Sequence, residues 1–181
     1  MLSVNDFNQL EREAATAALY RCCGSARWAR EMVAKRPFTS IKVLREEADK
    51  IWAGMREDDW LEAFAAHPEI GAREQEASAS QHPTPAGDPR WSAQEQGGVA
   101  SATTVTRERL ARANREYYER FGFIFIVCAT GKTAAELLAA IEDRLSSSRE
   151  RELAVAAEEQ RKITQLRLQK LIDVSSEPSV R

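Results

Sequence analysis

The sequence predicts an all-α fold: a single-domain bundle of about eight helices with one extended apolar segment near 123–129. Apolar residues recur at helical spacing along nearly the whole chain. The run over 123–129 (FIFIVCA) is continuously apolar and β-branched, yet no second comparable run exists to pair with it, and a lone strand is not viable. We therefore expect an extended segment, or the first turn of a helix, that passes through the core. A chain of 181 residues is also long enough to bury a core as one domain.

The helices are delimited by capping residues and by residues that stop a helix. The predicted helices cover about 3–18, 25–36, 40–55, 58–67, 92 onward, 106–121, 133–145 and 148–174. The predicted N-terminal caps are Ser3 with Asp6, Ser25, Thr39 or Ser40, Ser92 with Glu95, Thr133 with Glu136, and Ser148. Pro37 must end the second of these helices near Arg36, and Gly122 is the expected stop after residue 121.

Residues 72–91 interrupt the helical pattern. Their composition changes to Ala, Ser, Gln, Pro, Gly and Asp, which is typical of a loop. We expect a flexible loop within one domain spanning 1–181, and a disordered tail over 175–181. His82 lies in this loop and is expected to be exposed to solvent.

Composition argues against several classes of partner and cofactor. Charged residues make up 30% of the chain and nearly balance, with a formal net charge of -2 and no lysine–arginine block, so we expect no nucleic-acid partner. No apolar stretch is long enough to span a bilayer, and no signal peptide is recognisable. Three cysteines, two of them adjacent, form no disulfide framework and indicate a reducing, cytoplasmic compartment. Nothing has zinc-ligand spacing, so we expect no metal.

His67 is one of only two histidines, and a proline follows it directly. Histidine is the side chain whose ordinary pKa lets it exchange protons near neutral pH. Because the residue before a proline is pushed out of the α region, we expect His67 at a helix end, where it can face a pocket. Taken alone, a histidine in this position more often closes a helix at the surface than takes part in catalysis.

Arg167 lies in the middle of the apolar face of the last helix, four residues from both Ile163 and Leu171. Arginine is almost never buried unless it is paired, because loss of its hydration costs several kcal/mol. Two interpretations are about equally favoured. One is an internal salt bridge or a guanidinium that reaches the surface. The other is a bound anionic substrate, which the planar guanidinium matches.

Residues 92–96 (SAQEQ) combine a capping box with possible chemistry. Ser92 and Glu95 have capping-box spacing, and the free N–H groups of a helix N-terminus can bind anions or carbonyl oxygens. Glu95 can instead act with His67 in acid–base catalysis. Gln96 can bind a urea-like edge by paired hydrogen bonds.

Six short motifs occur in an order that carries a family resemblance. They are residues 36–38 (RPF), 67–71 (HPEIG), Ser92 with Glu95 and Gln96, 118–122 (YERFG), 125–129 (FIVCA), and Lys162-Ile163 with Leu166-Arg167-Leu168. In these motifs the chain resembles the 2-oxo-4-hydroxy-4-carboxy-5-ureidoimidazoline (OHCU) decarboxylases, from about Phe7 to about Leu171. It departs at Ile124, where the family often has proline, and in its long loop between Gly71 and Ser92.

The resemblance implies a carboxy-lyase that converts OHCU to (S)-allantoin and CO2, the last step of urate degradation to allantoin. It also implies an all-α homodimer without metal or organic cofactor, with His67 as proton donor and Glu95 as its catalytic partner. The implied substrate contacts are Pro68, Ser92, Ala93, Gln94, Glu95, Gln96, Phe125, Ile126, Val127, Cys128, Ala129 and Arg167. The main chain of an extended core segment needs hydrogen-bond partners, and the substrate can supply them at 125–129.

Two other functions remain open at this point. A helical interaction module would bind partner helices through its apolar stripes. It requires Arg167 to pair internally and no pocket to join His67 to Glu95. A different cofactor-free lyase or hydrolase would act on a related ureido compound.

Overall fold

Most of the chain that the structure describes is helical. A computed structural model describes residues 2–70, 91, 94–95, 97–99 and 102–172. Within these ranges the α-helices are α1 (Val4–Gln9), α2 (Arg12–Cys23), α3 (Ala26–Ala34), α4 (Ile41–Ala53), α5 (Glu57–Ala65), α8 (Thr104–Phe121), α9 (Ala134–Arg144) and α10 (Arg149–Leu171), with a short 3-10 helix η1 (Gly97–Val99). These ranges contain eight α-helices and no strand, so the all-α prediction is confirmed.

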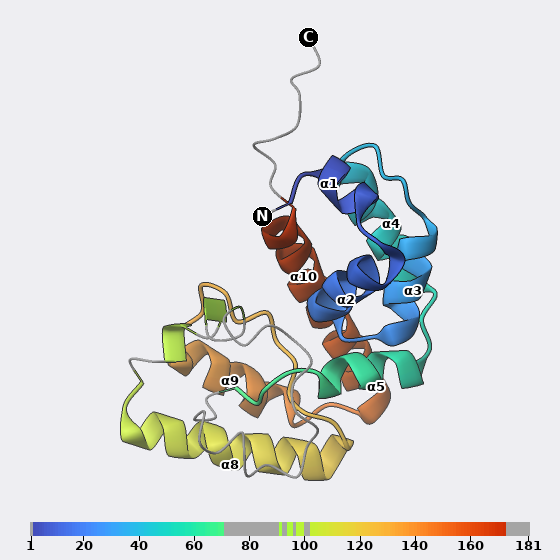
Figure 1. The fold of residues 1–181 in the computed structure, drawn as a ribbon. Helices are drawn as coiled ribbons and strands as arrows, with labels where there is room; N and C mark the ends of the chain where they lie inside the picture. The colour runs from blue at the N-terminus through green and yellow to red at the C-terminus, as the bar shows by residue number, and fades with distance from the viewer. Residues whose placement is uncertain (1, 71–90, 92–93, 96, 100–101, 173–181) are drawn as a thin grey trace.

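The long helix α10 organises the bundle. Helices α2, α4 and α5 contact it, and α3 packs on α2 and α4. Helices α8 and α9 pack on each other at the opposite end (Figure 1). At the C-terminal end of α10, Leu2 N donates to Leu171 O at 3.0 Å, so the start of the described chain lies beside the end of this helix. Both groups of helices contribute residues to one hydrophobic core.

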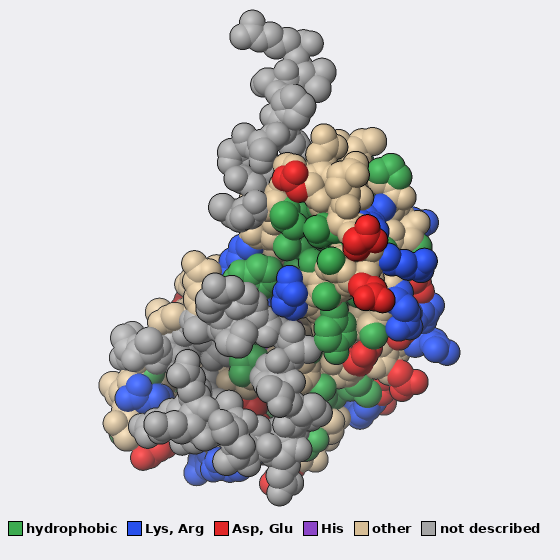
Figure 2. All heavy atoms as spheres, in the orientation of Figure 1, with side chains coloured by type: hydrophobic (Ala, Val, Ile, Leu, Met, Phe, Trp, Pro, Cys, Tyr) green, Lys and Arg blue, Asp and Glu red, His purple; other side chains and the backbone are tan. Residues whose placement is uncertain are grey.

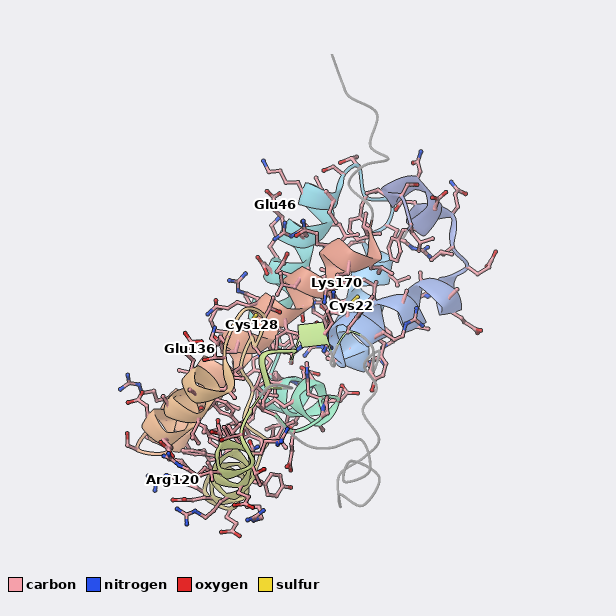
Figure 3. The ribbon with its side chains drawn as sticks, turned by 90° about the vertical axis from the view of Figure 1, so that its left-hand side faces the viewer. Cys22, Glu46, Arg120, Cys128, Glu136 and Lys170 are labelled. Atoms are coloured by element: carbon pink, nitrogen blue, oxygen red, sulfur yellow. The ribbon has the colours of Figure 1, made fainter. Side chains whose placement is uncertain are left out.

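The extended segment connects α8 to α9, as predicted. Residues 124–129 are neither helix nor strand, and all of them except Cys128 are buried. The backbone N–H of Cys128 donates to Glu159 of α10, and Figure 3 shows Arg120 of α8 at the far end of the molecule from Cys128. The segment therefore passes through the core beside α10.

Most predicted helix ends are confirmed. Side chains of Ser3, Ser25, Ser40, Thr133 and Ser148 each accept a backbone N–H of the first helical turn. Gly122 ends α8 in the left-handed region, at a φ of 80° that glycine adopts without strain. The last helix ends at Leu171, before the expected position.

The prediction of one helix over 3–18 is wrong, because the chain forms α1 and α2 with Leu10 extended between them. Arg36 supplies the physical reason. Its Nη1 donates to the carbonyl oxygens of Phe7 at 3.2 Å and Leu10 at 2.7 Å. Carbonyls at the end of a helix lack intrahelical partners, and the guanidinium satisfies them here.

Some sequence expectations lie outside the described residues. These are the loop over 72–91 apart from Trp91, His82 within it, and the tail over 175–181. None of the helices in the described part of the chain combines the length and apolar character needed to cross a membrane. On the face drawn in Figure 2, charged side chains of both signs lie along the α3 and α4 side, and neither sign dominates.

Candidate active site

His67 lies immediately beyond the end of α5, as the following proline predicts. Its backbone N–H donates to Phe64 O at 3.1 Å, which ties it to the last helical turn. Three residues later, Ile70 O accepts a hydrogen bond of 2.9 Å from Asn114 Nδ2 of α8. The segment that carries His67 is therefore held at both ends by helices.

The end of α2 packs directly against this segment. Gly24 has a φ of 86°, and a Cβ placed on it would lie 2.5 Å from the Cβ of Ala66, the residue before His67. A side chain cannot fit at that separation, so a glycine is required where α2 meets α5. This close approach brings the end of α2 next to Ala66, the residue that precedes His67.

A pocket opens beside His67. Its enclosed volume is about 20 Å³, and the space around it opens toward solvent. The described residues that line it are His67, Pro68, Ile70, Glu95, Phe125, Ile126, Val127, Cys128, Ala129, Thr130, Ile163, Leu166 and Arg167. They are mostly apolar with a few polar groups, a composition typical of small-molecule sites.

The pocket brings together most of the residues singled out from the sequence. Each described candidate lines it except Gln94, which is exposed. Ser92, Ala93 and Gln96 lie outside the described residues. Four further residues line the pocket that were not among the predicted substrate contacts: Ile70, Thr130, Ile163 and Leu166. Helical spacing could have indicated Ile163, which is one turn before Arg167 on the same face of α10.

Arg167 meets Glu95 inside this pocket. Arg167 Nε lies 3.1 Å from Glu95 Oε1 and Arg167 Nη2 lies 2.8 Å from Oε2, so the pair is bidentate. Both side chains are buried, and Lys170 Nζ approaches Oε1 at 3.4 Å. The Glu95 carboxylate therefore carries a fixed geometry and two cationic neighbours.

This arrangement combines features of two interpretations of the sequence, the interaction module and the enzyme. The internal salt bridge expected of an interaction module is present. That module also required the absence of a pocket joining His67 to Glu95, and such a pocket is present. The ion pair is thus part of a site wall.

The extended wall of the pocket is fastened by side chains of α9 and α10. Arg144 Nη1 donates to Ile126 O at 2.8 Å, and Glu159 Oε2 accepts the backbone N–H of Cys128 at 2.7 Å. These two main-chain groups therefore already have protein partners. The segment's main chain is therefore not left unpaired at these two positions, because long side chains reach it from neighbouring helices.

The environment of His67 favours the neutral imidazole. The side chain is half-buried, and its Nε2 atom is enclosed. Burial, together with the positive charge of Arg167, lowers the pKa of His67 from 6.5 to about 3. A proton donated by His67 near neutral pH must therefore first be acquired by the imidazole.

This lowered pKa predicts a pH-dependent stability. Between pH 6.5 and about 3, unfolding exposes an imidazole that takes up a proton, so acid favours the unfolded chain. His67 alone adds a slope of up to about 1.4 kcal/mol per pH unit in that window. Urea unfolding at about pH 7.5 and about pH 5 should show a smaller acid loss for His67→Asn than for the parent. Parallel losses would show that the imidazole is not held neutral.

Within the described ranges, no three His, Cys, Asp or Glu side chains are grouped so that they could hold a metal ion. The site's charged groups are instead the Glu95–Arg167 pair and Lys170. Its arrangement suits chemistry that binds an anion and moves a proton.

Comparison with known proteins places this geometry in a family. The model of the OHCU decarboxylase family matches residues 8–169. The chain is 39% identical over 151 residues to the uric acid degradation bifunctional protein TTL of Arabidopsis thaliana, which covers 83% of this chain and 45% of that protein. It is 28% identical over 171 residues to the 2-oxo-4-hydroxy-4-carboxy-5-ureidoimidazoline decarboxylase of Halalkalicoccus jeotgali, covering 94% of this chain and 92% of that one.

A solved structure agrees with these matches. The crystal structure of an OHCU decarboxylase in the presence of (S)-allantoin superposes with a TM-score of 0.72 at 35% identity, covering 86% of this chain and 96% of the other. The chain spans less than half the length of the bifunctional relatives, 45% for TTL and 35% for PucL of Bacillus subtilis. The family match nevertheless covers nearly all of this sequence, and the chain belongs to the OHCU decarboxylase family.

Proposed function

We propose that this chain is a carboxy-lyase that converts OHCU to (S)-allantoin and CO2 without a cofactor, the last step of urate degradation to allantoin. One observation carries the proposal: a single pocket holds His67, the Glu95–Arg167 pair and the extended segment. In a member of this family, that combination supplies an anion-binding group, a carboxylate and a proton-transferring group at one place.

The substrate contains its own electron sink. When CO2 leaves, the bonding pair moves toward the ring C=N bond beside the carboxylated carbon, so neither pyridoxal nor thiamine is needed. The neighbouring hydroxyl then loses its proton as a carbonyl forms, and a proton adds to the adjoining ring carbon. Overall, one carboxylate is exchanged for one hydrogen, and one proton is taken up.

The site residues match these needs. Glu95 is held by Arg167, so its carboxylate can hold the substrate hydroxyl and help remove its proton. Arg167 contributes positive charge that stabilises an anionic portion of the substrate. His67 delivers the proton to one face of the new carbon centre, which yields a single enantiomer. The neutral imidazole can take up a proton from the substrate hydroxyl or from water before this step.

Turnover of freshly generated OHCU tests the proposal. The protein should accelerate CO2 release and yield allantoin enriched in the S enantiomer, whereas the spontaneous reaction without protein gives the comparison rate and racemic product. Allantoin, allantoate and hydroxyisourate should not be consumed. Consumption of one of these compounds and no acceleration with OHCU would instead indicate another lyase or hydrolase of ureido compounds.

Substitution of Arg167 should chiefly weaken substrate binding. Arg167→Lys keeps the positive charge but loses the planar bidentate fork, so we expect KM to rise about tenfold with a smaller change in kcat. Lysine is preferable to alanine here, because alanine would leave Glu95 buried without its main counter-ion. Arg161→Lys on the exposed side of the same helix is the matched control. An unchanged KM in Arg167→Lys would remove Arg167 from the substrate site.

The family resemblance also implies an oligomeric state and a cellular compartment, and both are part of the proposed function. A homodimer in the cytoplasm is expected, with OHCU as its small-molecule partner. Sedimentation of the purified chain would measure the first expectation, and a mass corresponding to a monomer at micromolar concentration would contradict it.

A further inference from the structure

Gln160 of α10 is a buried polar side chain with no role so far. It is fully buried, two helical turns before Arg167. Its Nε2 donates to Cys23 O at 3.1 Å and lies 3.2 Å from Thr164 Oγ1. Since a carbonyl oxygen only accepts hydrogen bonds, the NH2 group must face Cys23, and this fixes the orientation of the amide. Gln160 Oε1 must therefore face the other way.

Two atoms near this amide are among the enclosed side-chain atoms of the described residues that have no hydrogen-bond partner. They are Gln160 Oε1, which can only accept, and His67 Nε2. Interaction with the Gln160 side chain opposes the other influences and raises the pKa of His67, so Gln160 lies within reach of the imidazole. Buried polar atoms are rarely left without partners, because each such atom retains its desolvation cost. A hydrogen bond from His67 Nε2 to Gln160 Oε1 is the simplest arrangement that gives both enclosed atoms a partner.

We propose that Gln160 is a positioning residue for His67: Gln160 Oε1 accepts the Nε2–H of the imidazole and holds it in the tautomer whose lone pair is on Nδ1. The tautomer follows from the fixed amide, since an oxygen can pair only with a protonated ring nitrogen. The catalytic meaning of this contact rests on the proposed function, whereas the tautomer itself does not.

The contact also fixes where protons move. With Nε2–H committed to Gln160, Nδ1 is the nitrogen that takes up a proton and passes it to the substrate carbon. The support for this arrangement is rigid, because Gln160 links α10 to Cys23 at the end of α2. The next residue, Gly24, packs on Ala66 beside His67. The charged neighbours on the pocket side are Arg167, which disfavours the imidazolium, and Glu95.

Nitrogen NMR of histidine-labelled protein reads the tautomer directly. The background variant His82→Gln leaves His67 as the single histidine of the chain. Near neutral pH we expect one protonated ring nitrogen, Nε2, whose hydrogen exchanges slowly with solvent, and an unprotonated Nδ1. A ring protonated at Nδ1 alone would overturn the proposal without any further variant.

Gln160→Met tests the contact, and Gln165→Met is its matched control. Gln165 is also buried on α10, but its amide binds Arg45 O at 3.0 Å and Asp49 Oδ1 at 2.8 Å of α4. Both variants lose buried hydrogen bonds, so both should lose stability. Only Gln160→Met should speed exchange of the Nε2 hydrogen and add protonation at Nδ1. Equal ring spectra in Gln160→Met and its parent would overturn the assignment.

Kinetics separate a positioning role from a structural one. Gln160→Met should lower kcat about tenfold with KM within about twofold, because the imidazole loses its orientation while the substrate contacts stay. Gln165→Met should leave both constants within about twofold. If Gln160→Met does not fold, Gln160→Glu provides the opposite signature: its carboxylate should stabilise the imidazolium, which takes its second proton from solvent, so both ring nitrogens should carry a proton near neutral pH. An unchanged ring in Gln160→Glu would contradict the contact. Absence of turnover in the parent would count against the proposed function and leave the NMR result standing.

Discussion

Replacing His67 with asparagine is expected to lower kcat by about 10²- to 10⁴-fold and to leave the fold intact, because a positioned acid–base group contributes a factor of that size. The asparagine amide keeps a donor that can face Gln160, so the variant does not leave that buried oxygen without a partner. Single-turnover measurements with OHCU give the chemical step, and circular dichroism with urea unfolding checks the fold.

The chain offers a matched control in its second histidine. His82→Asn makes the same chemical change in a segment that the sequence predicts to be a solvent-exposed loop, and it should leave kcat within about twofold. A His67→Asn variant with kcat within about threefold of the parent would remove His67 from proton transfer. A large loss shared by both variants would point to the loop instead.

The fold was predictable because its signals are local. A capping side chain such as Ser25 or Thr133 and a stop such as Gly122 act within a few residues, so the sequence contains the whole cause. The break after α1 was not predictable in this way. It depends on Arg36, which reaches Leu10 from 26 residues away.

The difference between local signals and contacts of distant residues also explains which parts of the site could be predicted from the sequence. His67 could be placed at a helix end because Pro68 follows it, and Arg167 could be recognised as a charge on an apolar face. The partner of Arg167 could not be chosen, since Glu95 lies 72 residues away and only the packed fold brings it near. Gln160 was not predicted, although the sequence contains a signal for it. It lies seven residues before Arg167 and therefore shares the buried face of the same helix.

The buried cluster behind the extended segment was missed for a related reason. Glu152 reads as one of many acidic residues on a charged helix, yet it is fully buried. It accepts hydrogen bonds of 2.5 Å from both Tyr117 Oη and Arg144 Nε. Burial raises the pKa of Tyr117, so the phenol stays protonated and donates. These contacts join α8, α9 and α10, which no local pattern reveals.

Arg144→Met should lower the free energy of unfolding by about 3–5 kcal/mol, because it leaves the Glu152 carboxylate buried without its cation. It should also loosen the pocket wall, since Arg144 holds Ile126 O and stacks 4.6 Å from the ring centroid of Phe125. Urea unfolding measures the first effect, and a raised KM for OHCU measures the second.

An exposed pair between two of the same helices gives the control for this prediction. Arg109 of α8 contacts Glu142 of α9 at 2.7 Å, with side chains 55% and 45% exposed, so Arg109→Met should cost no more than about 1 kcal/mol. The double variant Arg144→Met/Glu152→Leu should recover part of the stability lost in Arg144→Met, because no unpaired charge is then buried. It should not recover the KM, since Ile126 O still lacks its donor. Equal losses in Arg144→Met and Arg109→Met would show that the buried cluster does not hold the wall of the site.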